Sequence, residues 1–273
     1  MEFDLHTHTT ASDGTLTPGE LVRLAKEMGL QGVAITDHDT VAGLEEGLAW
    51  GRACAVEVIP GIEISTDFEG HEVHLLGYFI DWKAAGLAQA LQGMTEQRAS
   101  RIEKMLFRLS ELGFPLDPGE VQRLAGTGVI GRPHLAVAMV NAGYVSSVQE
   151  AFARFLAKGA PAYVPRQKIA LAGAVRLVQE AGGIPVLAHP GLLKDPALVE
   201  RIIPCGILGL EVDYPEHTPA QKENLRELCR VHGLIPTGGS DFHGSIKATA
   251  LGECGASRPI VEQLRKKREE YHV

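Results

Sequence analysis

The sequence lacks the features of membrane-spanning and disulfide-stabilised proteins. It contains no run of about 18 apolar residues, which excludes a transmembrane helix. Cysteine occurs only four times in 273 residues, and the four are far apart and form no Cys-x-x-Cys pair. This argues against a disulfide framework and against a thiolate zinc site. The chain also opens without the basic and apolar segments of a secretory signal, so we expect a reduced, cytoplasmic protein.

Positive charge is also scarce. The 26 lysine and arginine residues are outnumbered by 34 aspartate and glutamate residues, for a formal net charge of -8. A protein that binds nucleic acid through its general surface is usually basic, so we expect neither binding of long nucleic acid nor a membrane partner. A phosphate-bearing partner must instead be held at a local positive site. Histidine, with 11 residues, is comparatively abundant and lies mostly beside carboxylates in short polar clusters.

The order of the expected elements indicates an α/β fold with a helical insertion. Short strands and helices alternate over residues 1–80, and the same alternation returns over 164–273. The segment between them, 81–163, is almost entirely helical in pattern, and we expect it to form an insertion or cap domain. Strands that alternate with helices favour a mostly parallel sheet, either open and doubly wound or closed into a barrel. No glycine-rich phosphate loop follows the first strand, which weakens a nucleotide-binding open sheet.

The positions of the polar clusters favour the barrel. They come at the carboxyl ends of expected strands, where the chain carries His6 and His8, Asp37 and His38, Glu63, His189, and Asp241 and His243. In a barrel all these strand ends converge on one face, which is where barrel enzymes place their chemistry. We therefore expect the clusters to form a single site.

Several of these side chains have the spacing of metal ligands. The pairs His6 and His8, and Asp241 and His243, stand at positions i and i+2, which point to the same side at a strand end. Glu63 lies within an apolar strand, where an unpaired carboxylate is costly to bury. Asp13, taken alone, has the ordinary role of a turn-forming residue.

The full set is harder to explain by structural roles than any single member. It has nine candidate ligands, which are His6, His8, Asp13, His38, Glu63, His74, His189, Asp241 and His243. Histidine and carboxylate ligands without thiolate suit manganese, iron or zinc better than calcium or magnesium. Nine ligands exceed the needs of one ion, so we expect two or three divalent cations, with Mn²⁺ favoured over Fe²⁺ or Zn²⁺. Clustered metals about 3.5–4 Å apart are a common apparatus for phosphate-ester displacement.

The insertion supplies a candidate substrate site in Gly131-Arg132-Pro133-His134. Arg132 would clamp a phosphate through two hydrogen bonds, and His134 would bind a phosphate oxygen or the leaving group. The alternative is an ordinary helix start with a solvated Arg132, although a helix N-terminus also favours phosphate. Two further basic residues, Arg166 and Lys168, are expected on the solvated surface.

In their order along the chain, the motifs resemble those of the PHP (polymerase and histidinol phosphatase) family. The resemblance covers essentially the whole sequence and implies a distorted seven-stranded (β/α) TIM-like barrel with a helical insertion. It also implies a partition of the ligands. His6, His8, Glu63 and Asp241 would hold one metal, and Glu63, His74 and His189 a second. Asp13, His38 and His243 would hold a third metal or contact the substrate phosphate.

Within that family, the chain resembles the group of 3′,5′-nucleotide bisphosphate phosphatases and RNase AM. This implies release of the 3′-phosphate from a small phosphorylated nucleotide, with trimming of a short RNA 5′ end as a related activity. Arg132 and His134 would then be the catalytic residues outside the metal site, with Asp13 and His38 also available to bind substrate. One alternative is a histidinol-phosphate phosphatase, whose cap would present carboxylates to a cationic substrate. Another is a metal-stabilised regulatory module without turnover.

Overall fold

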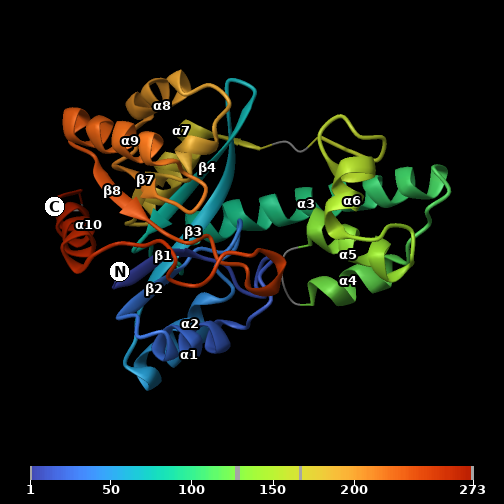
Figure 1. Cartoon of the computed structure of the whole chain (residues 1–273), viewed down its shortest axis with the longest axis horizontal. Helices are drawn as coiled ribbons and strands as arrows, with labels where there is room; N and C mark the ends of the chain where they lie inside the picture. The colour runs from blue at the N-terminus through green and yellow to red at the C-terminus, as the bar shows by residue number, and fades with distance from the viewer. Residues whose placement is uncertain (1, 127–129, 166–167, 272–273) are drawn as a thin grey trace. The chain divides into compact units, whose positions relative to one another are not determined.

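The computed structural model describes residues 2–126, 130–165 and 168–271 (Figure 1). Arg166 lies outside these residues. The chain divides into two compact units, Met1–Gln89 with Lys168–Val273, and Ala90–Gln167. The boundary between Gln89 and Ala90 falls inside a helix, α3 (Ala85–Glu111). The chain therefore passes from the first unit into the second along one continuous helix.

The first unit is a barrel of strands with helices on its outside (Figure 1). Its strands are β1 (Phe3–Thr7), β2 (Gly32–Ile35), β3 (Glu57–Phe68), β4 (His71–Tyr78), β5 (Ile169–Ala170), β6 (Ile184–Leu187), β7 (Gly209–Asp213) and β8 (Ile235–Gly238). Its helices are α1 (Pro18–Glu27), α2 (Leu44–Cys54), α7 (Leu171–Glu180), α8 (Ala197–Ile202), α9 (Pro219–His232) and α10 (Arg258–Tyr271), with the start of α3.

The strands follow the order β1-β2-β3-β4-β6-β7-β8, and the short β5 pairs with β3 beside this path. The chain after β8 returns to β1, where the backbone N–H of His8 donates to the carbonyl of Phe242 over 2.9 Å. Seven strands therefore come close to a closed ring, which confirms the expected distorted seven-stranded barrel. Its interior is apolar: β2 is buried along its whole length, as is usual for strands covered on both faces.

The ribbon formed by β3 and β4 departs from the parallel pattern. We expected Glu63 at the carboxyl end of a strand, but β3 continues to Phe68 and pairs antiparallel with β4 around the turn Glu69-Gly70. β4 is antiparallel to β6 as well. No helix separates the two strands in sequence, so the chain reverses through a hairpin, and Glu63 lies within a strand and not at its end.

The second unit is helical over its described residues. Besides the rest of α3 it contains α4 (Pro118–Ala125), α5 (Arg132–Asn141), α6 (Val148–Ala151) and a π-helical turn, Phe152–Leu156. These elements share an apolar core of their own, which includes Met105, Val121 and Met139. The unit therefore has the separate core that an independent domain requires.

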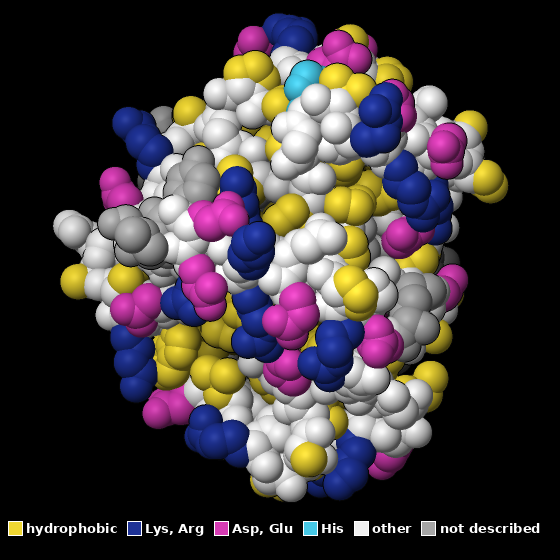
Figure 2. Space-filling view, turned by 90° about the vertical axis from the view of Figure 1, so that its left-hand side faces the viewer, with side chains coloured by type: hydrophobic (Ala, Val, Ile, Leu, Met, Phe, Trp, Pro, Cys, Tyr) yellow, Lys and Arg dark blue, Asp and Glu magenta, His cyan; other side chains and the backbone are white. Residues whose placement is uncertain are grey.

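The described helices contain no candidate membrane span, and the face drawn in Figure 2 carries charges of both signs. None of the described helices combines the length and the apolar character needed to cross a membrane. On the face turned toward the viewer in Figure 2, lysine and arginine side chains are interspersed with aspartate and glutamate side chains. The described side chains of that face thus form no continuous basic surface.

Candidate metal centre

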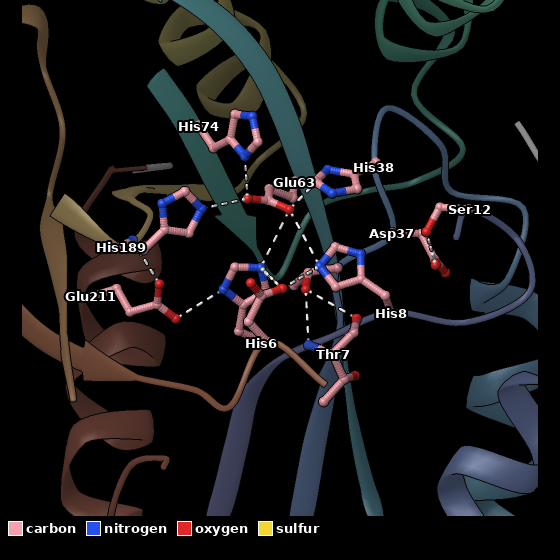
Figure 3. A network of polar contacts seen from close by, with 12 residues as sticks. His6, Thr7, His8, Ser12, Asp37, His38, Glu63, His74, His189 and Glu211 are labelled. Atoms are coloured by element: carbon pink, nitrogen blue, oxygen red, sulfur yellow. Dashed lines mark hydrogen bonds and ion pairs between the residues drawn. The ribbon is translucent and has the colours of Figure 1, made fainter. Parts of the chain in front are cut away.

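One end of the barrel unit gathers most of the expected ligands around Glu63 (Figure 3). His6 is delivered by β1, Glu63 by β3 and His74 by β4. His189 follows β6, and Asp241 and His243 follow β8. The sequence separates these residues by up to 237 positions, from His6 to His243, and the barrel brings them together.

Four buried side chains form the first group, His6, His8, Glu63 and Asp241, whose potential ligand atoms all lie within 4.8 Å of one another. The Nε2 atoms of His6 and His8 are each 3.3 Å from Glu63 Oε2. His8 Nε2 is also 3.1 Å from Asp241 Oδ1. These are the four residues that the family resemblance assigns to one metal.

Two more groups share members with the first. One contains His38, Glu63 and His74, and the other contains His8, Asp13, His38 and His243. The group around His74 thus includes His38, where His189 was expected. His189 nevertheless reaches the cluster, because its Nε2 lies 3.1 Å from Glu63 Oε1. All nine expected ligands therefore belong to one connected cluster.

Glu63 is the centre of that cluster and its two oxygens face different neighbours. Oε2 lies 2.9 Å from His38 Nδ1, whereas Oε1 lies 2.8 Å from His74 Nδ1. Burial by itself would raise the pKa of this carboxyl, but the surrounding imidazoles, His38 first, hold it well below its ordinary value. A carboxylate with this arrangement can bridge two cations.

The pKa values of two imidazoles, those of His74 and His6, shift in the opposite sense. Burial would lower the pKa of His74, but Glu63 and Glu72 together outweigh that effect and raise this pKa to about 9. The pKa of His6 is likewise raised well above its ordinary value, because Glu211, Asp241 and Glu63 overcome the effect of burial. Positive charge nearby therefore stabilises the buried carboxylates, and protons or divalent cations can supply it.

The residues fit divalent cations by a second criterion, their unsatisfied polar atoms. Buried side-chain atoms without a hydrogen-bond partner include His6 Nε2, both ring nitrogens of His8, Asp13 Oδ1, His38 Nδ1 and Glu63 Oε2. Such atoms are rare in folded proteins because leaving them unpaired is costly. Their concentration in one cluster of nitrogen and oxygen donors is what a site for Mn²⁺, Fe²⁺ or Zn²⁺ requires.

Glu211 is a part of the site that the sequence analysis missed. It is fully buried on β7, with Oε1 2.9 Å from His6 Nδ1, and Oε2 accepts the backbone N–H of His189 over 2.7 Å. The first contact directs His6 Nε2 into the cluster, and the second holds His189 at its unusual φ of 29°. The signal was available, since Glu211, like Glu63, is a carboxylate in an apolar strand.

The two aspartates beside His38 brace the surrounding loops. Asp37 accepts hydrogen bonds from the Thr9 backbone N–H, the Thr9 hydroxyl and the Ser12 hydroxyl over 2.6–2.7 Å. Asp39 accepts the N–H of Ser65 on β3 over 2.9 Å. Of the residues 37–39, only His38 therefore presents its side chain to the cluster.

The second unit contains the two candidates for phosphate binding. Arg132 and His134 belong to the second unit, where the Arg132 guanidinium lies over the rings of Phe152 and Tyr163 at 5.6 and 5.8 Å. His134 Nδ1 accepts the N–H of Gly131 over 3.0 Å. The role of Arg132 and His134 in phosphate binding stays a prediction.

The expectation for Lys168 was wrong. Its side chain is only 13% exposed, and its Nζ lies 2.5 Å from Glu72 Oε1. Lys168 precedes β5, which pairs with β3 and so brings the lysine beside the antiparallel ribbon. The sequence analysis did not include β5, and without it the contact could not be predicted.

Comparison with known proteins assigns this chain to a family. The PHP-domain family model matches residues 4–144. The chain is 39% identical to the 5′-3′ exoribonuclease Rnm of Escherichia coli, over 92% of this chain and 88% of the relative. It is 36% identical to a phosphoribosyl 1,2-cyclic phosphate 1,2-diphosphodiesterase of Eggerthella lenta, over 89% and 95%. It is 33% identical to a 3′,5′-nucleoside bisphosphate phosphatase of Chromobacterium violaceum, over 96% and 92%.

A similar solved structure supports the same family assignment. A protein of Bifidobacterium adolescentis described as a metal-dependent phosphoesterase superposes with a TM-score of 0.91 at 33% identity, over 97% of this chain and 96% of that chain. The chain therefore belongs to the PHP-domain family, and it is a phosphoric ester hydrolase with the fold of metal-dependent phosphoesterases.

Proposed function

We propose that this protein releases the 3′-phosphate of nucleoside 3′,5′-bisphosphates, with the removal of nucleotides from the 5′ end of short RNA as a related activity. The observation that carries the proposal is the cluster of unpaired buried ligand atoms around Glu63. The relatives that act on a 3′,5′-bisphosphate and on an RNA 5′ end favour this substrate class among phosphate esters. The acidic balance of the chain favours a small substrate over long nucleic acid, and the scattered thiols favour the cytoplasm.

The nine clustered residues would hold two or three divalent cations, Mn²⁺ first. When bound, these cations would stabilise negative charge on the phosphate and lower the pKa of water at the site. Glu63 would share its two oxygens between cations, and His6, His8 and Asp241 would complete one of the sites. Glu211 would keep His6 in the tautomer that leaves Nε2 free for the cluster.

The main substrate contacts are assigned to Arg132 and His134, which do not belong to the nine candidate ligands. Arg132 would bind oxygens of the reacting phosphate through N–H groups of its guanidinium, and a histidine, His134 or His189, would hold a proton for the leaving ribose oxygen. Asp13 and His38 would contact the phosphate directly if only two cations bind. A planar guanidinium already oriented between two rings suits such a contact, because little side-chain freedom is lost on binding.

A panel of substrates tests the proposal. Phosphate release by the Mn²⁺-loaded protein should be compared for adenosine 3′,5′-bisphosphate, AMP, histidinol phosphate, phosphoribosyl 1,2-cyclic phosphate and a short 5′-phosphorylated RNA. We expect the highest kcat/KM with the 3′,5′-bisphosphate and measurable shortening of the RNA. Highest activity with histidinol phosphate or the cyclic phosphate would overturn the assignment.

The role of Arg132 is tested by Arg132→Ala. We expect kcat/KM to fall about 100-fold or more, because a charged donor to the transition state is lost. Metal content per chain should stay that of the parent protein, and Arg132→Lys should recover only part of the activity because it lacks the two-pronged contact. Loss of metal from Arg132→Ala would show that the residue supports the metal centre instead.

A further inference from the structure

A cavity of about 230 Å³ lies beside the metal cluster within the barrel unit. Its wall is formed by the residues His38, Glu63, His74, His189, Leu192, Tyr214, Glu216, Asp241 and Lys247. Among these, the carboxylates belong to Glu63, Glu216 and Asp241, and Lys247 is the one lysine or arginine. A phosphate ester bound in this cavity would therefore meet the ammonium of Lys247, the one lysine or arginine among the described residues of its wall.

Lys247 forms an ion pair with Asp241, whose carboxylate also accepts a hydrogen bond from Tyr214. Its Nζ lies 2.5 Å from Asp241 Oδ2, and the same oxygen accepts the Tyr214 hydroxyl over 2.9 Å. The other oxygen of this carboxylate, Oδ1, faces His8 Nε2 at 3.1 Å, on the side of the ligand group. Asp241 would thus keep its orientation through Tyr214 if Lys247 moved away.

Lys247 is also able to change partner. Its side chain is 37% exposed, whereas Asp241 is almost fully buried. A lysine ammonium has three N–H donors on a flexible four-carbon stem, so a bond to one carboxylate oxygen leaves donors for a second anion. A cation bound at the cluster would share the charge of Asp241 and weaken its hold on the ammonium.

We propose that Lys247 is a substrate-binding residue that holds a non-bridging oxygen of the phosphate monoester in this cavity, in exchange for part of its contact with Asp241. The inference deepens the proposed function and rests on it for the identity of the nucleotide. The contact itself requires only a phosphate group. It would give the barrel unit a phosphate contact of its own, whatever Arg132 contributes from the second unit.

The test compares Lys247→Met and Lys247→Arg with Lys222→Met. Lys222 is a matched control, because it is also paired with an aspartate, Asp213 at 3.8 Å, and does not line the cavity. Binding of orthophosphate to the Mn²⁺-loaded proteins is measured by titration calorimetry, together with metal content and melting temperature. We expect Lys247→Met to weaken phosphate binding about 10- to 100-fold, Lys247→Arg to keep most of the affinity, and Lys222→Met to match the parent.

The outcomes separate this inference from the proposed function. Unchanged phosphate affinity in Lys247→Met would overturn the inference even if the 3′,5′-bisphosphate is the best substrate. Weakened affinity with full metal content would support it even if the panel points to a different phosphate ester. Loss of metal from Lys247→Met and Lys247→Arg alike would overturn it, because Lys247 would then act on the orientation of Asp241. If Lys247→Met melts far below the parent, Lys247→Gln replaces it in the same measurement.

Discussion

Glu63 on β3 and Glu211 on β7 are both buried carboxylates, but their partners differ. Glu63 is surrounded by imidazole nitrogens that have no other hydrogen-bond partner, which marks it as a candidate ligand. Glu211 instead accepts from His6 Nδ1 and from the His189 backbone. Its effect on a bound metal would therefore pass through His6, whose ring orientation and tautomer it sets.

Replacing Glu211 by glutamine should weaken metal binding while leaving the nine candidate ligands in place. We expect the affinity for Mn²⁺ to fall about 10- to 100-fold, because a neutral amide holds the imidazole less firmly and is a poorer acceptor. The measurement is a metal titration followed by melting temperature and by metal content. Glu223→Gln, at an exposed position on α9, should behave as the parent. Equal Mn²⁺ affinity in Glu211→Gln would contradict a positioning role for Glu211.

At the scale of elements, local sequence patterns predicted individual strands and helices. They did not predict which distant strands pair or in which direction. The expected strands before them placed His6 and His8, and Asp241 and His243, at strand ends, and the i and i+2 spacing indicated that each pair points to one side. The antiparallel direction of β4 and the existence of β5 depend on contacts that no local pattern encodes. For the same reason Lys168 was misplaced and Lys247, on an irregular segment after β8, was not considered at all.

The loop between β1 and α1 shows how one element depends on another. Asp37, after β2, holds this loop through Thr9 and Ser12. We expect Asp37→Ala to lower the free energy of unfolding by about 2 to 4 kcal/mol, because buried donors lose a charged acceptor. Denaturant unfolding measures the change.

The control for Asp37→Ala is Thr17→Ala, which removes the side-chain cap of α1 at the far end of the same loop. It should cost only about 1 kcal/mol. It should also leave Mn²⁺ affinity unchanged, whereas Asp37→Ala should reduce that affinity because Asp13 loses its support. A cost for Asp37→Ala no larger than that of the cap would show that the loop is held by other contacts.

At the scale of the whole molecule, the net charge of -8 is misleading about the site. Asp13, Glu63 and Asp241 contribute to that charge, but all three face the imidazoles of the cluster. Divalent cations at the cluster would turn the local field positive while the surface stays acidic. Sequence composition could therefore exclude a broad basic surface but could not report the sign of the site.

Removal of metal should affect both activity and stability. We expect a chelator to abolish turnover and to lower the melting temperature, and Mn²⁺ to restore both. A ligand present at about 1,000 times its Kd stabilises a protein by about 4 kcal/mol, so the shift should be easily resolved by calorimetry. If Mn²⁺ restored the melting temperature but gave no turnover with any ester of the panel, the cluster would be a structural site and the enzymatic assignment would fail.

The two ends of the chain complete one another at the barrel's seam. The Asp4 carboxylate accepts the backbone N–H groups of Ser240 and Gly252 over 2.9 and 2.8 Å, and Phe3 exchanges backbone hydrogen bonds with Ala256. During synthesis β1 is made well before these partners, which follow it by 236 or more positions. A growing or prematurely ended chain that stops before this segment exposes the edge of β1 and lacks Asp241 and His243. Only a chain that extends past His243 can therefore assemble the complete cluster.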